Sequence, residues 1–127
     1  ESQFRRMVFN VVSRNQDDHV KNIAFLMDRS GSWSLAPAFD VTYAFQPDGL
    51  WTSRHQMTIN GKQDGFSMAD FEACANSASM KRGRAATIID EVQTVVSRWR
   101  DYAEDAGVVS HQRDAIQKTL RLESFGR

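Results

Sequence analysis

Residues 84–105 read RAATIIDEVQTVVSRWRDYAED and contain the most regular apolar pattern in the chain. Apolar side chains recur there at intervals of three and four residues, which places them on one face of an α-helix. These side chains are Ile88, Ile89, Val92, Val95, Val96, Trp99 and Tyr102. A glycine typical of helix ends follows at position 107. We therefore predict one long helix over residues 84–105, with this apolar face in the core.

Two segments near the ends of the chain are also predicted to be helical. Residues 1–13 have the same spacing, through Phe4, Met7, Val8, Val11 and Val12. No capping residue with a leading turn precedes this pattern, so we expect the chain to begin inside or just before a helix of a longer protein. Ser110 is predicted to cap a last helix with an apolar face of Ala115, Ile116 and Leu120.

A helix is predicted to start at Ser67 and to run to about residue 78. Asp70 follows three positions after Ser67, which is the spacing of a capping box. Phe66 precedes the cap and Phe71 follows at the fourth helical position, so the two rings are expected to form a hydrophobic staple. Cys74 lies on this helix between two alanines and is expected to be a small buried side chain.

A small β-hairpin is predicted between the first two helices. Residues 23–28 and 32–35 contain short apolar runs, and the sequence DRSGS between them, at residues 28–32, is typical of a turn. Trp33 and Trp51 are expected to pack against the rest of the molecule. The sequence thus predicts one mainly α domain over residues 1–127 with an early β insertion.

The composition excludes several classes of protein. Of the 127 residues, 41% are hydrophobic and 25% charged, as in soluble globular proteins and unlike collagen or disordered chains. Sixteen basic residues balance sixteen acidic ones, so a nucleic-acid-binding surface is not indicated. The single cysteine favours a reducing compartment, and no apolar run is long enough for a membrane span, so we expect a cytoplasmic protein. His55 and His111 are expected at the surface.

The residues that could take part in catalysis or metal binding lie between positions 15 and 40. Asp17 and Asn22 are five residues apart in one polar loop, and Asp40 follows eighteen residues later, just after the predicted hairpin. A phosphotransferase needs a carboxylate to orient the acceptor hydroxyl and take its proton. It also needs oxygen ligands for magnesium, which an asparagine and an aspartate on neighbouring loops can supply. The Asp-x4-Asn spacing is that of a kinase catalytic loop.

Two sequence motifs resemble the HipA family of bacterial serine/threonine kinases. Residues 15–23 read NQDDHVKNI and match a family pattern Asn-x-Asp-x-His-x-x-Asn. Residues 35–41 read LAPAFDV and match a pattern Leu-x-Pro-x-Tyr/Phe-Asp. The sequence MTINGK at residues 57–62 and the Ile-Ile-x-Glu-Val run at 88–92 resemble further family elements. The resemblance implies the helical C-terminal lobe of a kinase, with the hairpin carrying its catalytic and metal-binding loops.

The resemblance assigns roles to individual residues. Asp17 matches the catalytic aspartate that contacts the acceptor hydroxyl, and Asn22 and Asp40 match the residues that bind Mg²⁺ and, through it, ATP. His19 and Lys21 match loop positions near the transferring phosphate. Asp18 departs from the family pattern, where this position is often small, and we expect it to point outward. From the residues alone, each could also be an ordinary loop, turn or cap residue.

Half of a kinase nucleotide site is missing from this sequence. No glycine-rich phosphate loop occurs, and no Val-Ala-Ile-Lys-like strand offers a lysine for the phosphates. In the family these features belong to an N-terminal lobe, which we expect to precede residue 1. The 127-residue chain alone is therefore expected to have no measurable kinase activity.

The resemblance implies a function for the intact protein. It would be the toxin of a toxin–antitoxin pair and transfer the γ-phosphate of ATP to a protein hydroxyl with Mg²⁺. Its partners would be a HipB-like DNA-binding antitoxin and a protein substrate, with an aminoacyl-tRNA synthetase as a candidate. Two alternatives stay open at this stage. One is a non-catalytic module derived from a kinase lobe, with an antitoxin-binding or regulatory role. The other is a small-molecule kinase.

Overall fold

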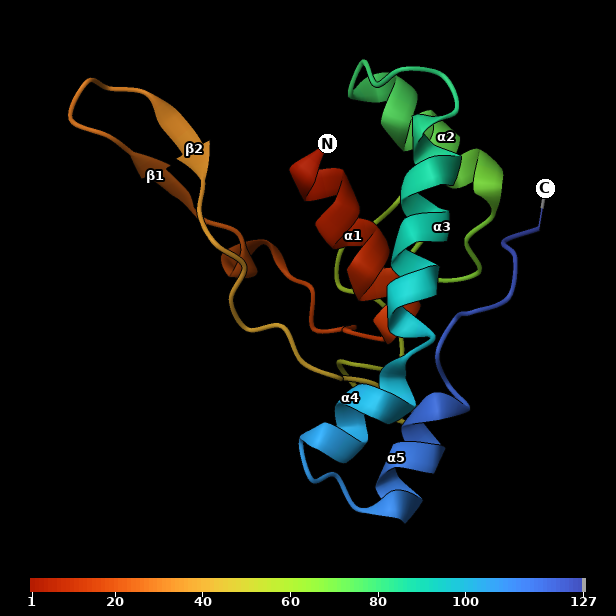
Figure 1. Ribbon diagram of the computed structural model, residues 1–127. Helices are drawn as coiled ribbons and strands as arrows, with labels where there is room; N and C mark the ends of the chain where they lie inside the picture. The colour runs from red at the N-terminus through yellow and green to blue at the C-terminus, as the bar shows by residue number, and fades with distance from the viewer. Residues whose placement is uncertain (127) are drawn as a thin grey trace.

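The computed structural model describes residues 1–126 and is mainly helical (Figure 1). Its α-helices are α1 (Ser2–Ser13), α2 (Met68–Ser77), α3 (Arg84–Val96), α4 (Trp99–Asp105) and α5 (Ser110–Gln117). Between α1 and α2 lie one 3-10 turn, η1 (Val20–Asn22), and the strands β1 (Phe25–Met27) and β2 (Trp33–Leu35). The prediction of a mainly α chain with one early hairpin is confirmed.

The core forms where α1 and α2 pack against α3 (Figure 1). Val8 and Val12 on α1, Phe71 on α2 and Ile88 on α3 have no exposed surface at all. Val8, Val12 and Ile88 belong to apolar faces predicted from their spacing, and Phe71 was predicted as a partner in the hydrophobic staple. Burying a side chain of this size stabilises the fold by roughly 1.5–3 kcal/mol, so these faces hold the three helices together.

The start of α2 confirms two predictions made from the sequence. The Ser67 backbone N–H donates to Asp70 Oδ2 over 2.8 Å, and the capping box is complete. The rings of Phe66 and Phe71 lie 6.1 Å apart, as expected of the staple. Lys62 Nζ also donates to Asp70, and this bond is the main reason that the pKa of Asp70 falls well below its ordinary range. The preceding loop is thereby fixed to α2.

The hairpin projects away from the helical body (Figure 1). Its strands are antiparallel, with Phe25 opposite Leu35 and Met27 opposite Trp33. Phe25, Met27 and Trp33 are each 58% exposed or more, and Trp51 is 69% exposed. The expectation that both tryptophans are packing residues is therefore wrong for the described chain. The hairpin is too far from the helices for its apolar side chains to reach the core.

The predicted long helix over residues 84–105 is wrong, because two helices occupy this range. α3 ends at Val96, and α4 begins at Trp99 in a new direction (Figure 1). The Ser97 hydroxyl donates to the carbonyl of Thr94 over 2.8 Å, a local bond of the kind that competes with helix propagation. Trp99 Nε1 donates to the carbonyl of Arg113, which draws α4 toward α5.

The end of the chain returns along the helical body. Ser110 is the first residue of α5 and Val109 occupies the cap position, so the predicted cap is off by one residue. After α5 the chain runs back past α1 to α2, where the rings of Phe125 and Phe71 lie 4.9 Å apart. Among the helices of residues 1–126, none combines the length and the apolar character that crossing a membrane requires.

Candidate functional site

The end of α1 determines how the polar loop leaves the core. Arg14 adopts a left-handed conformation with φ of 61°, and the Asn15 N–H donates to the Asn10 carbonyl over 2.9 Å, which terminates the helix. The next residues pair with a distant loop, since Gln16 N–H donates to the Ala44 carbonyl. The Gln16 side chain is fully buried and donates to the carbonyl of Thr52. The residues before Asp17 are thus rigidly held.

Asn22 closes the loop back onto Asp17. Its Nδ2 donates to the backbone carbonyl of Asp17 over 3.1 Å, and its backbone N–H donates to the His19 carbonyl over 3.0 Å. This closure forms the 3-10 turn η1, in a segment that the sequence had predicted only as a loop. The amide oxygen of Asn22 and the second N–H of Nδ2 stay available to contact a ligand. The Asp17 carboxylate stays half-exposed, 3.9 Å from His19 Nε2.

Asp40 reaches the same region from beyond the hairpin. Arg6 on α1 donates to the carbonyl of Ala36 over 2.7 Å, so the segment leading to Asp40 is attached to the first helix. The backbone of Asp40 is left-handed, with φ of 51°. Aspartate adopts this conformation more readily than most residues, and Arg14, Asn60 and Ser79 also have positive φ in this chain. The side chain of Asp40 is exposed.

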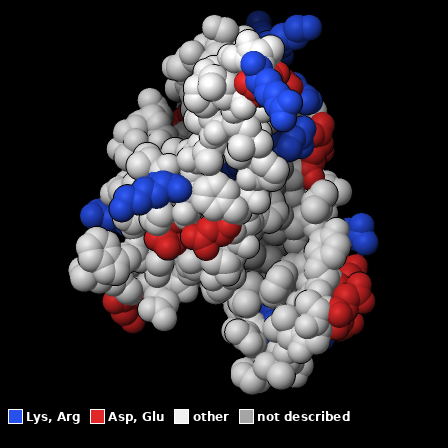
Figure 2. All heavy atoms as spheres, turned by 90° about the vertical axis from the view of Figure 1, so that its left-hand side faces the viewer, with Lys and Arg blue, Asp and Glu red and all other residues white. Residues whose placement is uncertain are grey.

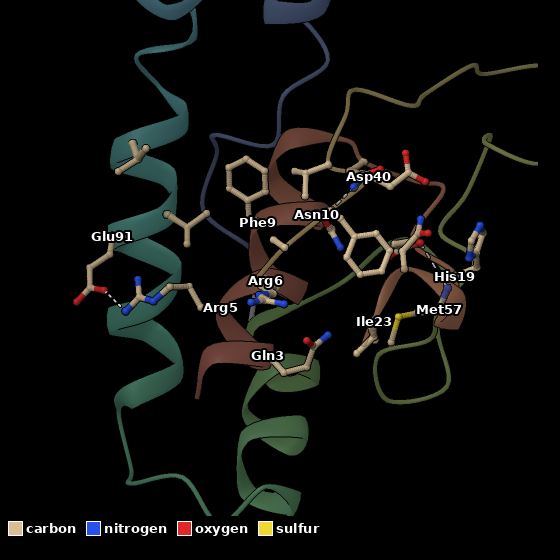
Figure 3. A pocket seen from close by; sticks show the side chains of 18 residues that line it. Gln3, Arg5, Arg6, Phe9, Asn10, His19, Ile23, Asp40, Met57 and Glu91 are labelled. Atoms are coloured by element: carbon tan, nitrogen blue, oxygen red, sulfur yellow. Dashed lines mark hydrogen bonds and ion pairs between the residues drawn. The ribbon is translucent and has the colours of Figure 1, made fainter. Parts of the chain in front are cut away.

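A cavity of about 610 Å³ brings three of the predicted residues together, namely His19, Asn22 and Asp40. It lies between α1, α3 and the loops on either side of the hairpin. Figure 3 shows Asp40 near His19 and Met57 on one side of the cavity, and Arg5 with Glu91 on the other. Asp17 does not line the cavity: its backbone carbonyl accepts from Asn22 Nδ2, and its carboxylate lies 3.9 Å from His19 Nε2. Lys21 is exposed and does not belong to the cavity wall.

Several polar atoms in the cavity wall have no protein partner. They are Gln3 Oε1, Asn15 Oδ1 and His19 Nδ1, each buried and without a hydrogen bond to the described residues. Leaving a buried polar atom unpaired costs roughly 1–3 kcal/mol, so such groups usually face a water or a ligand. His19 Nδ1 is the closest of the three in sequence to the predicted catalytic loop, and it is available to bond a ligand oxygen.

Asp18 and His55 overturn two expectations. Asp18 does not point outward: it is 6% exposed, and its Oδ2 lies 2.8 Å from His55 Nδ1. His55 is 1% exposed rather than at the surface, whereas His111 is exposed on α5 as predicted. A charged side chain next to a polar loop looks solvated in the sequence. Here it is buried because a histidine 37 positions later offers a hydrogen-bond partner.

Asn22 and Asp40 fit the requirements of a magnesium ion. Mg²⁺ takes oxygen ligands and is commonly held by one or two protein side chains together with substrate phosphates. The orientation of the Asn22 amide directs its nitrogen to Asp17 and leaves its oxygen free for such contact. Within residues 1–126, no group of three or more His, Cys, Asp or Glu side chains could hold a metal unaided. A Mg²⁺ ion held by Asn22 and Asp40 would have its other positions open to water or substrate phosphates.

The charges around the cavity are largely compensated. Arg5 on α1 pairs with Glu91 on α3, and this bond lowers the pKa of Glu91. Figure 2 shows the hairpin side of the molecule, where basic and acidic groups are interspersed among uncharged surface. This distribution does not resemble the continuous basic surface of a nucleic-acid-binding protein.

A model of a protein family, described as the HipA-like C-terminal domain, matches residues 1–99. The chain belongs to this family. No match was found among curated proteins. The matched range contains α1, the hairpin, α2 and α3, and all five residues that the resemblance assigned to a site. α5 and all of α4 except its first residue lie outside the matched range.

Sequence reasoning missed two residues that support the loop. His55 holds Asp18, and Arg121 holds His55 through a 2.9 Å contact between Nη1 and Nε2. His55 stands in an irregular segment, and Arg121 lies 66 residues further along the chain. Neither has a spacing that links it to Asp18, so no pattern in the sequence could have paired them.

Proposed function

We propose that this domain is the catalytic lobe of a HipA-like serine/threonine kinase. In this proposal the lobe transfers the γ-phosphate of ATP to a protein hydroxyl. The observation that carries it is the shared cavity of Asn22 and Asp40, beside a loop whose geometry leaves the Asn22 oxygen free. Membership in the HipA-like family supports the same reading.

The residues of the loop have separate tasks in this proposal. The Asp17 carboxylate, half-exposed and 3.9 Å from His19 Nε2, orients the acceptor hydroxyl and takes its proton. Asn22 and Asp40 would hold Mg²⁺, which when bound neutralises charge on the phosphates. His19 Nδ1, buried and unpaired, can donate to a phosphate oxygen when it carries the proton. Lys21, exposed next to the turn, is proposed to approach the phosphates only when substrate is bound.

The exposed hairpin supports a site that is completed by further structure. Phe25, Met27 and Trp33 form a projecting apolar surface on the segment between Asn22 and Asp40. Soluble proteins rarely leave such a surface uncovered. We propose that a nucleotide-binding lobe with the missing glycine-rich loop and lysine covers it. We therefore expect the 127-residue chain alone to be inactive.

The biological role follows from the family only. We propose that the intact protein is a cytoplasmic toxin that is neutralised by a HipB-like DNA-binding antitoxin. An aminoacyl-tRNA synthetase is the candidate substrate. Co-purification of the protein with the product of a neighbouring gene that encodes a small DNA-binding protein would support this role.

The proposal is tested by phosphate transfer from labelled ATP with the protein as its gene encodes it. Replacing Asp17 by Asn is expected to lower transfer by roughly 10²–10⁴-fold, the usual contribution of a positioned general base. Asn22→Ala is expected to abolish the magnesium-dependent phosphate transfer. Asp48→Asn, a change of the same chemistry on an exposed loop, serves as the control and should keep full activity. Equal activity of Asp17→Asn and Asp48→Asn would refute the proposal.

A further inference from the structure

A buried chain of three polar side chains connects the predicted catalytic loop to the end of the protein. Asp18 Oδ2 lies 2.8 Å from His55 Nδ1, and His55 Nε2 lies 2.9 Å from Arg121 Nη1. Asp18 is 6% exposed and His55 1% exposed, so water does not compete for these bonds. Asp18 stands between Asp17 and His19, the two loop residues with proposed chemical roles.

The partners of His55 determine which of its nitrogens carries the proton. An arginine guanidinium donates through every nitrogen and accepts through none. His55 Nε2 must therefore accept from Arg121, and it cannot carry a proton itself. Asp18 Oδ2 is an acceptor, so His55 Nδ1 must carry the proton and donate to it. This arrangement requires a neutral imidazole with its hydrogen on Nδ1. Arg121 then donates to His55, and His55 donates to Asp18.

Asp18 is held on its second oxygen as well. Asp18 Oδ1 accepts the backbone N–H of Gln56 over 2.8 Å and lies 3.5 Å from the N–H of Met57. Donors therefore surround both carboxylate oxygens, and the side chain has one orientation available. Because the neighbouring peptide units share its backbone, this orientation also fixes the peptides that lead to Asp17 and His19.

The other end of the chain of bonds is anchored to α1. The Arg121 backbone N–H donates to the Val12 carbonyl over 3.0 Å, and Arg121 Nη1 also donates to the Val11 carbonyl over 2.9 Å. Arg121 Nη2 bonds Asp64 in addition. Arg121 thus caps the last turn of α1, and α1 is the helix from which the loop departs. The loop is held at both its start and its middle by the same rigid support.

We propose that His55 is a positioning residue for phosphate transfer. It acts through Asp18 to hold the Asp17 carboxylate and the His19 ring in the orientation that the reaction needs. The inference rests on the proposed kinase function, but the contacts that carry it are independent of that function. A His55 that only satisfied buried polar groups would matter for stability, and its two hydrogen bonds would be interchangeable.

Two amide substitutions separate the two bonds of His55. In His55→Asn the side-chain nitrogen falls near the position of Nδ1, so it keeps a donor for Asp18 and loses the acceptor for Arg121. In His55→Gln the side-chain oxygen reaches the position of Nε2, so it keeps the acceptor for Arg121 and loses the donor for Asp18. Both variants are similar in chemistry, and His111→Gln on the surface of α5 is the control.

The first readout is steady-state phosphate transfer by the protein as its gene encodes it. His55→Gln is expected to lower kcat roughly 10- to 100-fold, the equivalent of a hydrogen bond to a charged group. His55→Asn should lower kcat less than about threefold, because this variant keeps the hydrogen-bond donor for Asp18. KM for ATP should change little in both, since neither substitution touches Asn22 or Asp40. Equal losses of kcat in the two variants would overturn the proposal.

The second readout does not depend on kinase activity. In the wild-type protein, imidazole ¹⁵N NMR should find His55 neutral and protonated on Nδ1. Amide hydrogen exchange at residues 17–19 should speed up in His55→Gln and stay near wild type in His55→Asn. A proton on Nε2, or equal exchange in the two variants, contradicts the proposal. If transfer is absent in the wild type while these results hold, the kinase function fails and the positioning network stands.

A milder variant keeps the inference testable if His55→Gln does not fold. Asp18→Asn has one acceptor oxygen where Asp18 has two. When that oxygen accepts from Gln56, the amide nitrogen faces the proton on His55 Nδ1, and two donors oppose each other. Asp18→Asn should therefore lower kcat and speed exchange at residues 17–19 in the same direction as His55→Gln. Unchanged kcat and exchange would contradict the proposal.

Discussion

The left-handed backbone of Asp40 predicts which of two variants, Asp40→Gly or Asp40→Ala, is the more stable. Asp40 has φ of 51°, a conformation that a Cβ atom disfavours. Alanine there should pay roughly 1–2 kcal/mol for the conformation. Glycine avoids this strain but loses roughly 0.5–1 kcal/mol more backbone entropy on folding. At the midpoints of the two ranges, Asp40→Gly should therefore be more stable than Asp40→Ala by about 0.75 kcal/mol.

The comparison is made by urea denaturation and thermal unfolding of the 127-residue chain. The expected difference corresponds to roughly 2–4 °C in Tm for a domain of this size. At an exposed position with ordinary φ the order is reversed, because alanine then exceeds glycine in stability. An Asp40→Ala chain as stable as Asp40→Gly, or more stable, would refute the conformation assigned to this residue. In the protein as its gene encodes it, both variants should lose magnesium-dependent nucleotide binding.

Three further predictions concern the support of the site. Phe71→Ala should destabilise the chain by about 3–5 kcal/mol in urea denaturation, whereas Leu50→Ala, at 84% exposed, should stay within about 0.5 kcal/mol. Folding lowers the pKa of Asp70 below its ordinary 3.8, so the stability it contributes is present above about pH 4 and lost as pH falls. Asp70→Asn should therefore flatten the loss of stability between about pH 5 and pH 2. Burial raises the pKa of the Cys74 thiol, so iodoacetamide at pH 8 should react more slowly with the folded chain than with the chain in urea.

Local patterns predicted the parts of the fold that local forces determine. The apolar spacing of α1 and the capping box at Ser67 both hold in the structure, because helix faces and caps depend on residues three to four positions apart. The hairpin was found from the turn at residues 28–32. There the Asp28 carboxylate accepts the N–H groups of Ser30 and Ser32, a contact between near neighbours.

The sequence predictions were wrong where contacts between residues far apart in the chain determine the structure. The new direction of α4 after Val96 depends on a distant contact in addition to the local Ser97 bond, since Trp99 donates to the Arg113 carbonyl 14 residues later. The burial of Asp18 depends on His55, and the burial of His55 depends on Arg121. For the candidate site, the motif indicated Asp17, Asn22 and Asp40 as one group. That His19, Asn22 and Asp40 share one cavity required the three-dimensional structure.

The central claim is that Asn22 and Asp40 hold the magnesium nucleotide while Asp17 acts on the hydroxyl. The most direct test measures Mg²⁺-dependent ATP binding by calorimetry and phosphate transfer in parallel, with the protein as its gene encodes it. The account predicts that Asp40→Asn loses the magnesium-dependent part of binding, and that Asp17→Asn keeps ATP affinity but loses transfer. Binding that is independent of Asp40, or transfer at the wild-type rate in Asp17→Asn, would contradict it.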